Sequence, residues 1–533
     1  MGILWFGGQI YTLENEGEAV EAVFTENDII KAVGTYEKLY HTYYEQIHQE
    51  INLYGKTMLP GFVDSHLHII GHGEKLLRLD LSQMKSAGEV LEALENRTAN
   101  LSEDEWLLGE GWNENQWEDT SIIHKSELDK ISKINPIMLT RVCRHAIITN
   151  SKAIELSNIN KNTANPQGGI IVRDKTGSTT GYFLDTAQDL IKKAMPSVSQ
   201  KYLEQIIRIA VDDLLSKGLV GGHSEDLNYY GGFRKTYESF KNAINGGEKR
   251  FKAHLLVHHE VLPAMVEQNL GYLDGTRYVE LGAVKIFSDG AIGGRTAWLT
   301  EDYADDTGNK GVAIHSRERL EAIVKEARLH DLPIAVHAIG DKAVAEIAEV
   351  IQKYPTKNGA RDRIIHGQIL NEETLELLKE LSVVIDIQPS FVSSDFPWVI
   401  DRVGENRMQL AYAWKTLLTN HIHCAGGSDA PIEEVDPLLG IQAAVLRKST
   451  YNGEVYSPDE RLSVFEAIQL YTIGSAYAIN QESVRGIIAE NYKADFTILA
   501  EDIFQVDPNY IHDIKVEMTV IDGEIVYEKN PSY

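Results

Sequence analysis

Cysteine, long apolar runs and positive charge are all scarce in this sequence of 533 residues. The two cysteines, Cys143 and Cys424, cannot form a disulfide framework or a thiolate zinc site, and we expect both to be buried. Apolar stretches such as residues 332–336 fall far short of the ~20 residues that a membrane span needs. The N-terminus shows no basic region followed by an apolar run, so we expect a cytoplasmic protein.

The acidic excess excludes two classes of partner. With 79 acidic and 51 basic residues, the formal charge is -28, which repels phosphate backbones and anionic lipid surfaces. We therefore expect a small-molecule substrate and neither nucleic acid nor a membrane, and we leave a homo-oligomer open. The apolar fraction of 43% is that of an ordinary globular protein with a sizeable core.

Both ends of the chain consist of short strand patterns separated by turns. In the tail, two such patterns are joined by Asp522-Gly523, which is a strong signal for a two-residue hairpin. Strands left unpaired at both termini would be prone to aggregation. We therefore predict that residues 1–57 and 486–533 form one small β-sandwich domain together.

Between these ends, short apolar strands alternate with amphipathic helices, a pattern typical of an α/β protein with a parallel sheet. Helical periods include residues 203–215, 343–351 and 464–478. Eight strand candidates favour a closed (β/α)₈ barrel of the TIM type over an open sheet. They are residues 58–66, 219–223, 253–257, 283–287, 333–337, 363–366, 383–387 and 423–427.

The distance between the first two of these strands predicts an inserted domain. The chain between them is far longer than the roughly 30 to 40 residues of a βα unit. We assign residues 58–72 and 198–485 to the barrel, and residues 73–197 to an α+β insert that acts as a lid or substrate domain. The insert carries three of the seven tryptophans, Trp106, Trp112 and Trp117.

Polar residues recur where the predicted barrel strands end. Because the carboxyl ends of all barrel strands open into the same mouth, residues far apart in sequence are expected to converge there. The six residues are His66, His68, Lys285, His337, His366 and Asp429.

Their types indicate a metal site. His66 and His68 are two apart in a strand and so share one face, where both can bind one ion. Imidazole and carboxylate ligands suit Zn²⁺ first, and also Mn²⁺, Fe²⁺ or Ni²⁺. Any single buried histidine is more often a hydrogen-bonded core residue than a ligand. Lys285, between two apolar residues, either points to solvent or holds its amine inside the mouth.

Five short stretches carry a resemblance to a known family: LPGFVDSHLH at 59–68, VKIFSDG at 284–290, AVHAIGD at 335–341, IHG at 365–367 and GSDAP at 427–431. In these motifs the chain resembles the amidohydrolase superfamily of metal-dependent hydrolases, and in particular its long members related to N-substituted formamide deformylase. The resemblance covers essentially the whole chain, including the insert segments 109–117, 141–151 and 168–169.

The resemblance implies a ligand set. His66, His68 and Asp429 would hold one metal, and His337 and His366 a second. In many relatives a lysine at the position of Lys285 is carboxylated and bridges the two ions, whereas other members keep a single metal. The sequence leaves one or two divalent ions open.

A mechanism follows from this set. Metal ions lower the pKa of bound water towards ~7, and Asp429 would take the proton of that water and return it to the leaving nitrogen. The metal, with His337 or His366 as a donor, would stabilise the oxyanion.

Three further residues are candidates for substrate binding. His145 lies where the resembled branch places a residue that reaches the substrate cavity, and the alternative is a structural histidine of the insert. Trp112 forms either an apolar cavity wall or part of the insert core. Arg295, in a glycine-rich loop, either binds a substrate oxygen or is solvated. We expect His72 to be a loop histidine in solvent rather than a ligand.

The leading functional hypothesis is a metal-dependent amidohydrolase that cleaves a C–N bond, either of an N-acyl or N-formyl amide or of a cyclic amide or amidine. One alternative is an aminohydrolase that deaminates a nucleobase-like ring. Another is a metal-binding scaffold without catalysis. The carboxylate of Asp429 argues against the scaffold, because a purely structural metal site closes its coordination.

Overall fold

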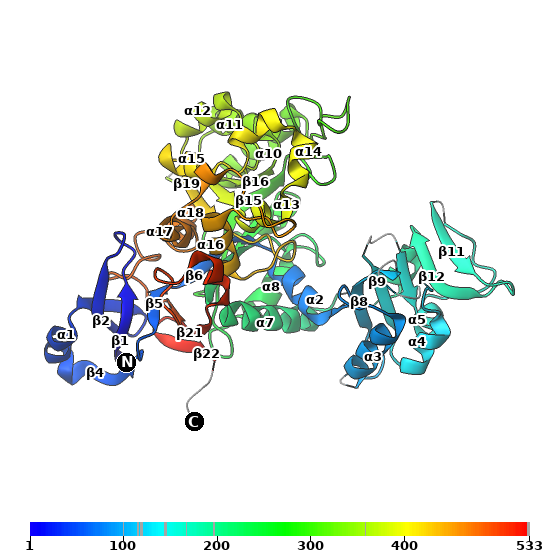
Figure 1. Ribbon diagram of the computed structural model, residues 1–533, viewed down its shortest axis with the longest axis horizontal. Coiled ribbons are helices and arrows are strands. Elements are labelled where there is room, and N and C mark those ends of the chain that lie inside the picture. Colours follow the sequence, from blue (N-terminus) through cyan, green and yellow to red (C-terminus); the bar gives the residue numbers. More distant parts are fainter. Residues whose placement is uncertain are drawn as a thin grey trace. The chain divides into compact units, whose positions relative to one another are not determined.

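The structure is a computed structural model that describes the chain except for residues 100, 115, 116, 118–120, 143–145, 167, 196, 197, 358 and 530–533. The chain divides into two compact units. One is formed by Met1–His72 and Gln200–Tyr533, and the other by Gly73–Ser199. The first unit holds a parallel barrel and a mixed terminal sheet, and the second holds a sheet of its own (Figure 1).

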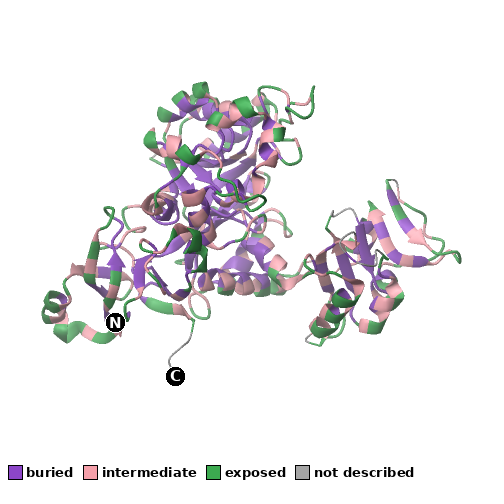
Figure 2. Ribbon diagram, viewed as in Figure 1, coloured by how far each residue is buried: buried purple, intermediate pink, exposed green. Residues whose placement is uncertain are grey.

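Eight parallel strands form a nearly closed barrel, which confirms the predicted fold class (Figure 1). Each strand pairs with the next one along the chain. The strands are β6 (Phe62–Leu67), β13 (Leu219–Ser224), β14 (Lys252–His258), β15 (Val279–Phe287), β16 (Ile334–Ala338), β17 (Asp362–His366), β18 (Val383–Ile387) and β19 (His423–Gly426). Figure 2 shows these strands as the buried interior of the first unit, with exposed residues on the helices around them.

The helices around the barrel follow their amphipathic patterns. The predicted helix at 203–215 is α7 (Gln200–Ser216), and the one at 343–351 is α11 (Asp341–Lys353). α7 buries apolar side chains at a spacing of three and four residues, namely Leu203, Ile206, Ile207, Ala210, Val211, Leu214 and Leu215. The predicted helix at 464–478 is instead two helices, α17 (Val464–Leu470) and α18 (Ile473–Ala478).

The first predicted strand, residues 58–66, is also divided. Its first part is β5 (Thr57–Pro60), which belongs to the terminal sheet, and its second part is β6 of the barrel. The break falls at Gly61, whose N–H donates to the carbonyl of Asp495 at 2.9 Å. A Cβ atom at Gly61 would lie 2.5 Å from Cγ1 of Val220, so this close approach requires glycine.

The two ends of the chain meet in one mixed sheet of eight strands. β5 connects the two halves, because it runs parallel to β1 and antiparallel to β20. Asp522 and Gly523 both have positive φ between β21 and β22, which confirms the predicted hairpin. The strands are β1 (Gly2–Tyr11), β2 (Ala19–Glu26), β3 (Ile29–Gly34), β4 (Ile47–Asn52), β5, β20 (Phe496–Leu499), β21 (Val516–Ile521) and β22 (Glu524–Glu528).

The unit Gly73–Ser199 has its own sheet and core. Its strands are β7 (Leu79–Asp80), β8 (Leu107–Trp112), β9 (Ile137–Arg141), β10 (Ala146–Thr149), β11 (Gly169–Arg173) and β12 (Thr179–Asp185), and its helices include α3 (Ala87–Thr98), α4 (Lys125–Ile131) and α5 (Ser151–Leu156). Trp112 and Trp117 are buried in its core, with their ring centroids 5.9 Å apart.

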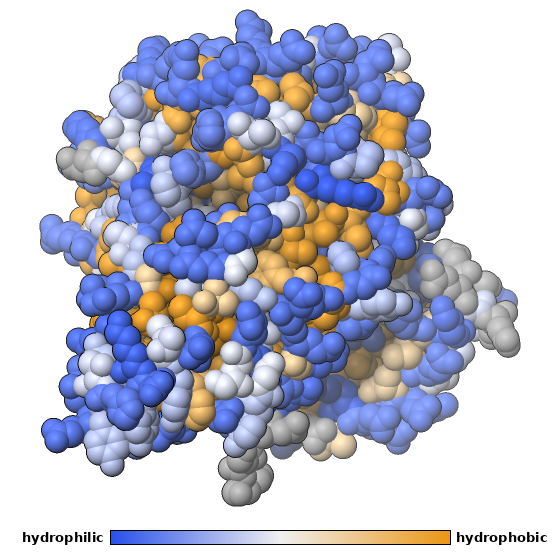
Figure 3. Space-filling model, turned by 60° about the vertical axis from the view of Figure 1, so that its left-hand side comes forward, coloured by the Kyte–Doolittle hydropathy of each residue, from blue (hydrophilic) through white to orange (hydrophobic). Residues whose placement is uncertain are grey.

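Hydrophilic residues predominate on the face shown in Figure 3, with apolar residues visible between them. Among the residues that the structure describes, none of the helices has both the length and the apolar composition to cross a bilayer. Cys424 is buried, as expected, and Cys143 lies outside the described residues.

The seam between the first and last barrel strands is closed by the loop after β19. The buried Asp64 of β6 accepts hydrogen bonds from the N–H of His66 (2.9 Å) and from the N–H (3.1 Å) and Oγ (2.6 Å) of Ser428. Burial raises the pKa of Asp64 to about 7 although these bonds lower it. The N–H of Asp429 then donates to the carbonyl of His66 at 2.7 Å. These bonds place Asp429 beside His66.

Gly427 lies at the tightest point of this seam, because a Cβ there would be 2.6 Å from the N atom of His66. We expect Gly427→Ala to lower the free energy of unfolding by about 2 kcal/mol, the scale of overpacking in a filled interior. Gly271→Ala is the matched control, since the nearest heavy atom to its Cβ would be 3.6 Å away. Urea unfolding followed by circular dichroism measures both, and equal stability of the two variants would contradict this account of the seam.

Candidate metal centre

All six residues predicted for the barrel mouth lie near the C-terminal ends of their strands. His66, Lys285, His337 and His366 belong to β6, β15, β16 and β17, His68 follows β6, and Asp429 follows β19. The structure brings these residues together. The ring centroids of His66 and His366 are 6.0 Å apart, and those of His337 and His366 are 4.5 Å apart.

His66, His68 and Asp429 form a three-ligand group whose ligand atoms all lie within 4.8 Å of one another. Oδ1 of Asp429 is 3.5 Å from Nε2 of His66 and 3.5 Å from Nε2 of His68. His66 is buried, whereas the side chains of His68 and Asp429 are 22% and 13% exposed. The group is therefore partly exposed.

The tautomer of His68 is set by a backbone contact. Its Nδ1 lies 2.6 Å from the carbonyl oxygen of Glu225, and a carbonyl only accepts, so Nδ1 carries a hydrogen. The other nitrogen, Nε2, is then directed at Asp429. Burial alone lowers the pKa of His68, but Asp429, Glu225 and Asp226 outweigh it and raise this pKa to about 9. A metal ion bound here would displace the proton that His68 otherwise holds.

His337 and His366 form a second pair of candidate ligands, and hydrogen bonds set their tautomers as well. Nε2 of His337 donates to the carbonyl of Gly290 (3.1 Å), which leaves its Nδ1 without hydrogen. Gln388 donates from its Nε2 to the carbonyl of Asp386 (3.0 Å), so its Oε1 accepts from Nδ1 of His366 (2.6 Å). Nδ1 of His337 and Nε2 of His366 therefore face each other, both with lone pairs, at 3.0 Å.

Neither ring of this pair carries an extra proton at neutral pH. Burial first, and then its neighbour His366, hold the pKa of His337 well below its ordinary value. Burial also lowers the pKa of His366 to about 4. Two lone pairs at this distance repel each other unless a cation lies between them or beside them. Because both N–H groups are engaged elsewhere, the two rings suit ligands better than oxyanion donors.

Lys285 lies next to the first group. Its side chain is fully buried, and its Nζ is 3.3 Å from Nε2 of His66 and 4.6 Å from the ring centroid of Phe287. Burial lowers its pKa, although the charges of Glu225 and Asp429 act in the opposite direction. The amine is thus on the metal side of β15 and not in solvent.

The donor set fits divalent metal binding. Four imidazoles, three of them with tautomers set by hydrogen bonds, and one carboxylate supply the nitrogen and oxygen ligands that Zn²⁺ and related ions take. His366 and Asp429 also have positive φ values of 78° and 56°, an uncommon conformation for non-glycine residues that also occurs at turns elsewhere in this chain.

Sequence reasoning missed the residues that support the ligands. Glu225 and Asp226 follow β13 directly and are buried beside His68, while Asp289 and Gln388 follow β15 and β18. Asp289 lies 3.6 Å from Nε2 of His337 and accepts the N–H groups of Ile339 and Gly340. Their position just after barrel strands was the available signal.

Two of the three predicted substrate residues have partners of their own, and the third lies outside the described residues. Trp112 is buried in the core of the insert, where its indole N–H donates to the carbonyl of Leu139 (3.4 Å). Arg295 makes a bidentate ion pair with Asp305 (3.0 and 2.6 Å). His145 lies outside the described residues. Their roles in binding stay predictions.

The expectation for His72 was wrong. It lies in α2 (Ile69–Leu77) and is only 4% exposed, with Nε2 2.8 Å from Oδ2 of Asp213 on α7. The glycines on either side of it suggested a turn, but the helix continues through them.

Comparisons with known proteins agree with the motifs. A family model described as "Amidohydrolase family" matches residues 49–527. "Putative amidohydrolase YtcJ" of Bacillus subtilis (strain 168) is 51% identical over 532 residues, which cover 99% of this chain and 100% of that protein. N-substituted formamide deformylase of Arthrobacter pascens is 24% identical, and the matched region covers 99% of this chain and 99% of that protein.

A solved structure agrees as well. The crystal structure of an uncharacterized metal-dependent hydrolase from Pyrococcus furiosus superposes with a TM-score of 0.80 at 29% identity, covering 95% of this chain and 100% of that one. The family match, the 51% identical relative and the structural likeness together show that the chain belongs to the amidohydrolase family of metal-dependent hydrolases.

Proposed function

We propose that this protein hydrolyses a C–N bond of the amide type with water, using Asp429 as the group that moves the proton. The observation that carries the proposal is the position of Oδ1 of Asp429, 3.5 Å from both His66 Nε2 and His68 Nε2 in a group that stays partly exposed. A carboxylate in that place reaches both a metal and a reactant that enters from the open side.

The residues of the chain have separate tasks in this proposal. His66, His68 and Asp429 would hold one divalent ion, most simply Zn²⁺, and His337 and His366 would hold a second. Such an ion lowers the pKa of bound water towards ~7. Asp429 accepts the proton of the attacking water and delivers it to the leaving nitrogen. Lys285, if carboxylated by CO₂, would add an anionic ligand beside His66, which resolves the cost of burying its amine.

Elemental analysis of protein purified without chelator tests the ligand set. We expect at least one equivalent of a divalent transition metal in the wild type, and a fall to less than ~0.2 equivalents in His66→Ala, because a vacant ligand position weakens binding strongly. His315→Ala is the matched control, since this half-buried histidine packs on His259 instead. A wild type without metal, whose activity no added metal restores, would contradict the site.

Replacing Asp429 tests the proton transfer. Asp429→Asn is expected to lower kcat on the order of 10²-fold or more, because a neutral amide cannot accept the proton. Metal content should stay mostly intact, since the amide oxygen remains a ligand. Asp213→Asn, a change at the carboxylate that pairs with His72, should leave kcat unchanged. Half of the wild-type activity in Asp429→Asn would remove Asp429 from the proposed role.

The aromatic residues of the barrel support a substrate with an apolar group. Phe391, on α13 (Ser390–Asp395), stacks on the ring of His366 at 5.9 Å, and Phe287 lies 5.2 Å from the ring of His337. Tyr229 is half-exposed and lies 6.4 Å from the ring of His68. Together with the relative named N-substituted formamide deformylase, these rings favour an N-formyl or N-acyl amide whose substituent is aromatic. The insert keeps the proposed role of a lid or substrate domain.

A panel of substrates distinguishes amide hydrolysis from deamination. We expect hydrolysis of N-formyl- or N-acetylbenzylamine with a lower KM than that of the corresponding small aliphatic amides, because the remote ring contributes binding energy. Phe391→Leu should raise the KM for the benzyl amide about 10-fold and leave that for the aliphatic amide nearly unchanged. Ammonia release from nucleobases with no amide cleaved would overturn the proposal in favour of an aminohydrolase.

A further inference from the structure

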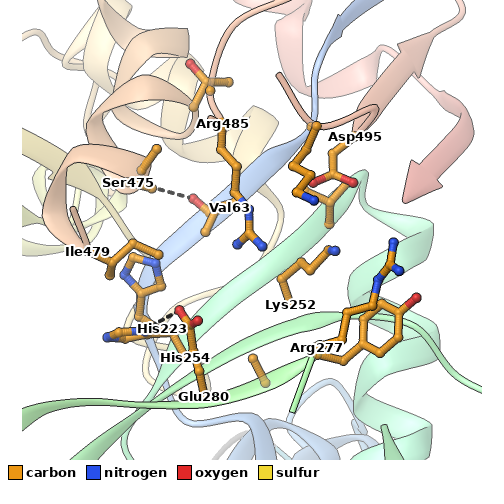
Figure 4. A pocket seen from close by; sticks show the side chains of 18 of the residues that line it. Val63, His223, Lys252, His254, Arg277, Glu280, Ser475, Ile479, Arg485 and Asp495 are labelled. Carbon is orange, nitrogen blue, oxygen red and sulfur yellow. Dashed lines mark hydrogen bonds and ion pairs between the residues drawn. The ribbon is translucent and has the colours of Figure 1, made fainter. Parts of the chain in front are cut away.

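A polar cavity lies at the opposite end of the barrel from the metal centre. Its volume is ≈ 40 Å³, and its lining includes residues near the starts of barrel strands, among them Val63, Lys252 and Glu280. Ser475 of α18 and Arg485 of the segment after it also line the cavity (Figure 4). All of these residues belong to one compact unit, and we call this space the floor cavity.

Two polar side chains of the floor cavity lack partners. His223 is 1% exposed, and neither of its ring nitrogens has a well-formed hydrogen bond among the described residues, although the backbone of Ser65 lies near enough to act on the ring. Nε of Arg485 is buried and has no hydrogen-bond partner among the described residues either, although the residue as a whole is only half-buried. Figure 4 shows this guanidinium directed into the cavity between His223 and Lys252. Buried polar atoms normally find hydrogen-bond partners, so these atoms indicate a place where a ligand or ordered solvent can bind.

The other cations of the floor cavity are already paired. Lys252 bonds to Oδ1 of Asp522 at 2.6 Å, and Arg277 bonds to Oδ2 of the same residue at 3.0 Å. Lys493 and Arg277 both bond to Asp28, at 2.8 and 2.9 Å. These contacts leave Arg485 as the cation without a hydrogen-bonded acid within the described lining.

The two acids of the lining are also engaged. Glu280 accepts from Nδ1 of His254 (2.9 Å) and from Gln481 (3.0 Å), and Asp495 accepts the N–H of Asp522 (2.8 Å). Glu280 acts on Arg485 only through space, because no ion pair joins them. Neither acid therefore forms an ion pair with the guanidinium of Arg485.

His223 can act as a neutral donor here. Burial, together with the charges of Arg363, His254 and Arg485, holds its pKa well below the ordinary value. A neutral imidazole keeps one N–H group, which an anion can accept. His223 thus offers a neutral hydrogen-bond donor to the floor cavity, and Arg485 offers a charged one.

The size of the floor cavity decides which ligand fits. One water-sized sphere takes roughly 10 to 15 Å³ of such volume, so the space holds about three waters or one small ion. A nucleotide, a sugar phosphate or the amide substrate is too large. We propose that the floor cavity binds a single small monovalent anion, such as chloride, between the guanidinium of Arg485 and the ring of His223.

The anion would join the chain after α18 to the floor of the barrel. Arg485 precedes β20 of the terminal sheet by only a short segment, whereas His223 belongs to β13. An ion held by both therefore links these two parts of the unit, and its binding stabilises the folded state by mass action. This inference does not depend on the proposed hydrolase activity.

Crystals of the wild-type protein soaked in bromide test the site directly. We expect an anomalous peak within hydrogen-bond distance of both Arg485 and His223. Density at this place without an anomalous signal would identify water and overturn the proposal.

Thermal unfolding in solution is the second test. At equal ionic strength, the wild type should unfold at a higher temperature in chloride than in gluconate, by on the order of 1–2 °C, whereas Arg485→Gln should show no difference between the salts. Arg461→Gln is the matched control, because this exposed arginine bonds to the carbonyl of Leu446 instead. A bromide peak in crystals without a chloride effect on the wild type would mean binding at crystal concentration only, which also overturns the proposal.

Discussion

The closure of the barrel between its first and last strands is the constraint on which the metal centre depends. His66 and Asp429 come from opposite ends of the barrel sequence, and only the β6–β19 seam makes them neighbours. Asp64 accepts hydrogen bonds from both sides of this seam, and Gly427 permits the approach because it has no side chain. The geometry of the ligands is therefore a property of the whole barrel, and no single segment contains it.

The interior beneath the ligands is unusually polar for a barrel, whose layers are commonly filled by branched apolar residues. Arg363 and Asp386 form a buried ion pair at 2.7 Å, and Arg363 also donates to the carbonyl of Ser65 at 2.6 Å, next to His66. Such a pair contributes little to stability on balance. Its use is positional, because it holds the backbone of β6 directly below the first ligand. Gln388 and the carbonyl of Glu225 act in the same way on His366 and His68.

The strands and the ligands could be predicted from the sequence because their signals are local. Apolar runs, and polar residues at the ends of those runs, are visible without any knowledge of the fold. The break at Gly61 could not be predicted, since it depends on contact with Val220, far away in the chain. The helix around His72 and the supporting role of Gln388 depend on tertiary packing in the same way. For Trp112, the sequence left a cavity wall and a buried core open, and its burial became visible only with the insert core.

The shared sheet of the two termini has a consequence for biosynthesis. On the ribosome, β1 to β5 emerge first, but the partner of β5 in the completed sheet, β20, is translated only after the entire barrel. Throughout that interval the edge of β5 stays open, and an open edge pairs readily with other chains. The final hairpin, β21–β22, arrives last. A nascent chain that stalls before β20 therefore exposes the unpaired edge of β5. We expect chaperones that cover such edges to bind this protein late in translation.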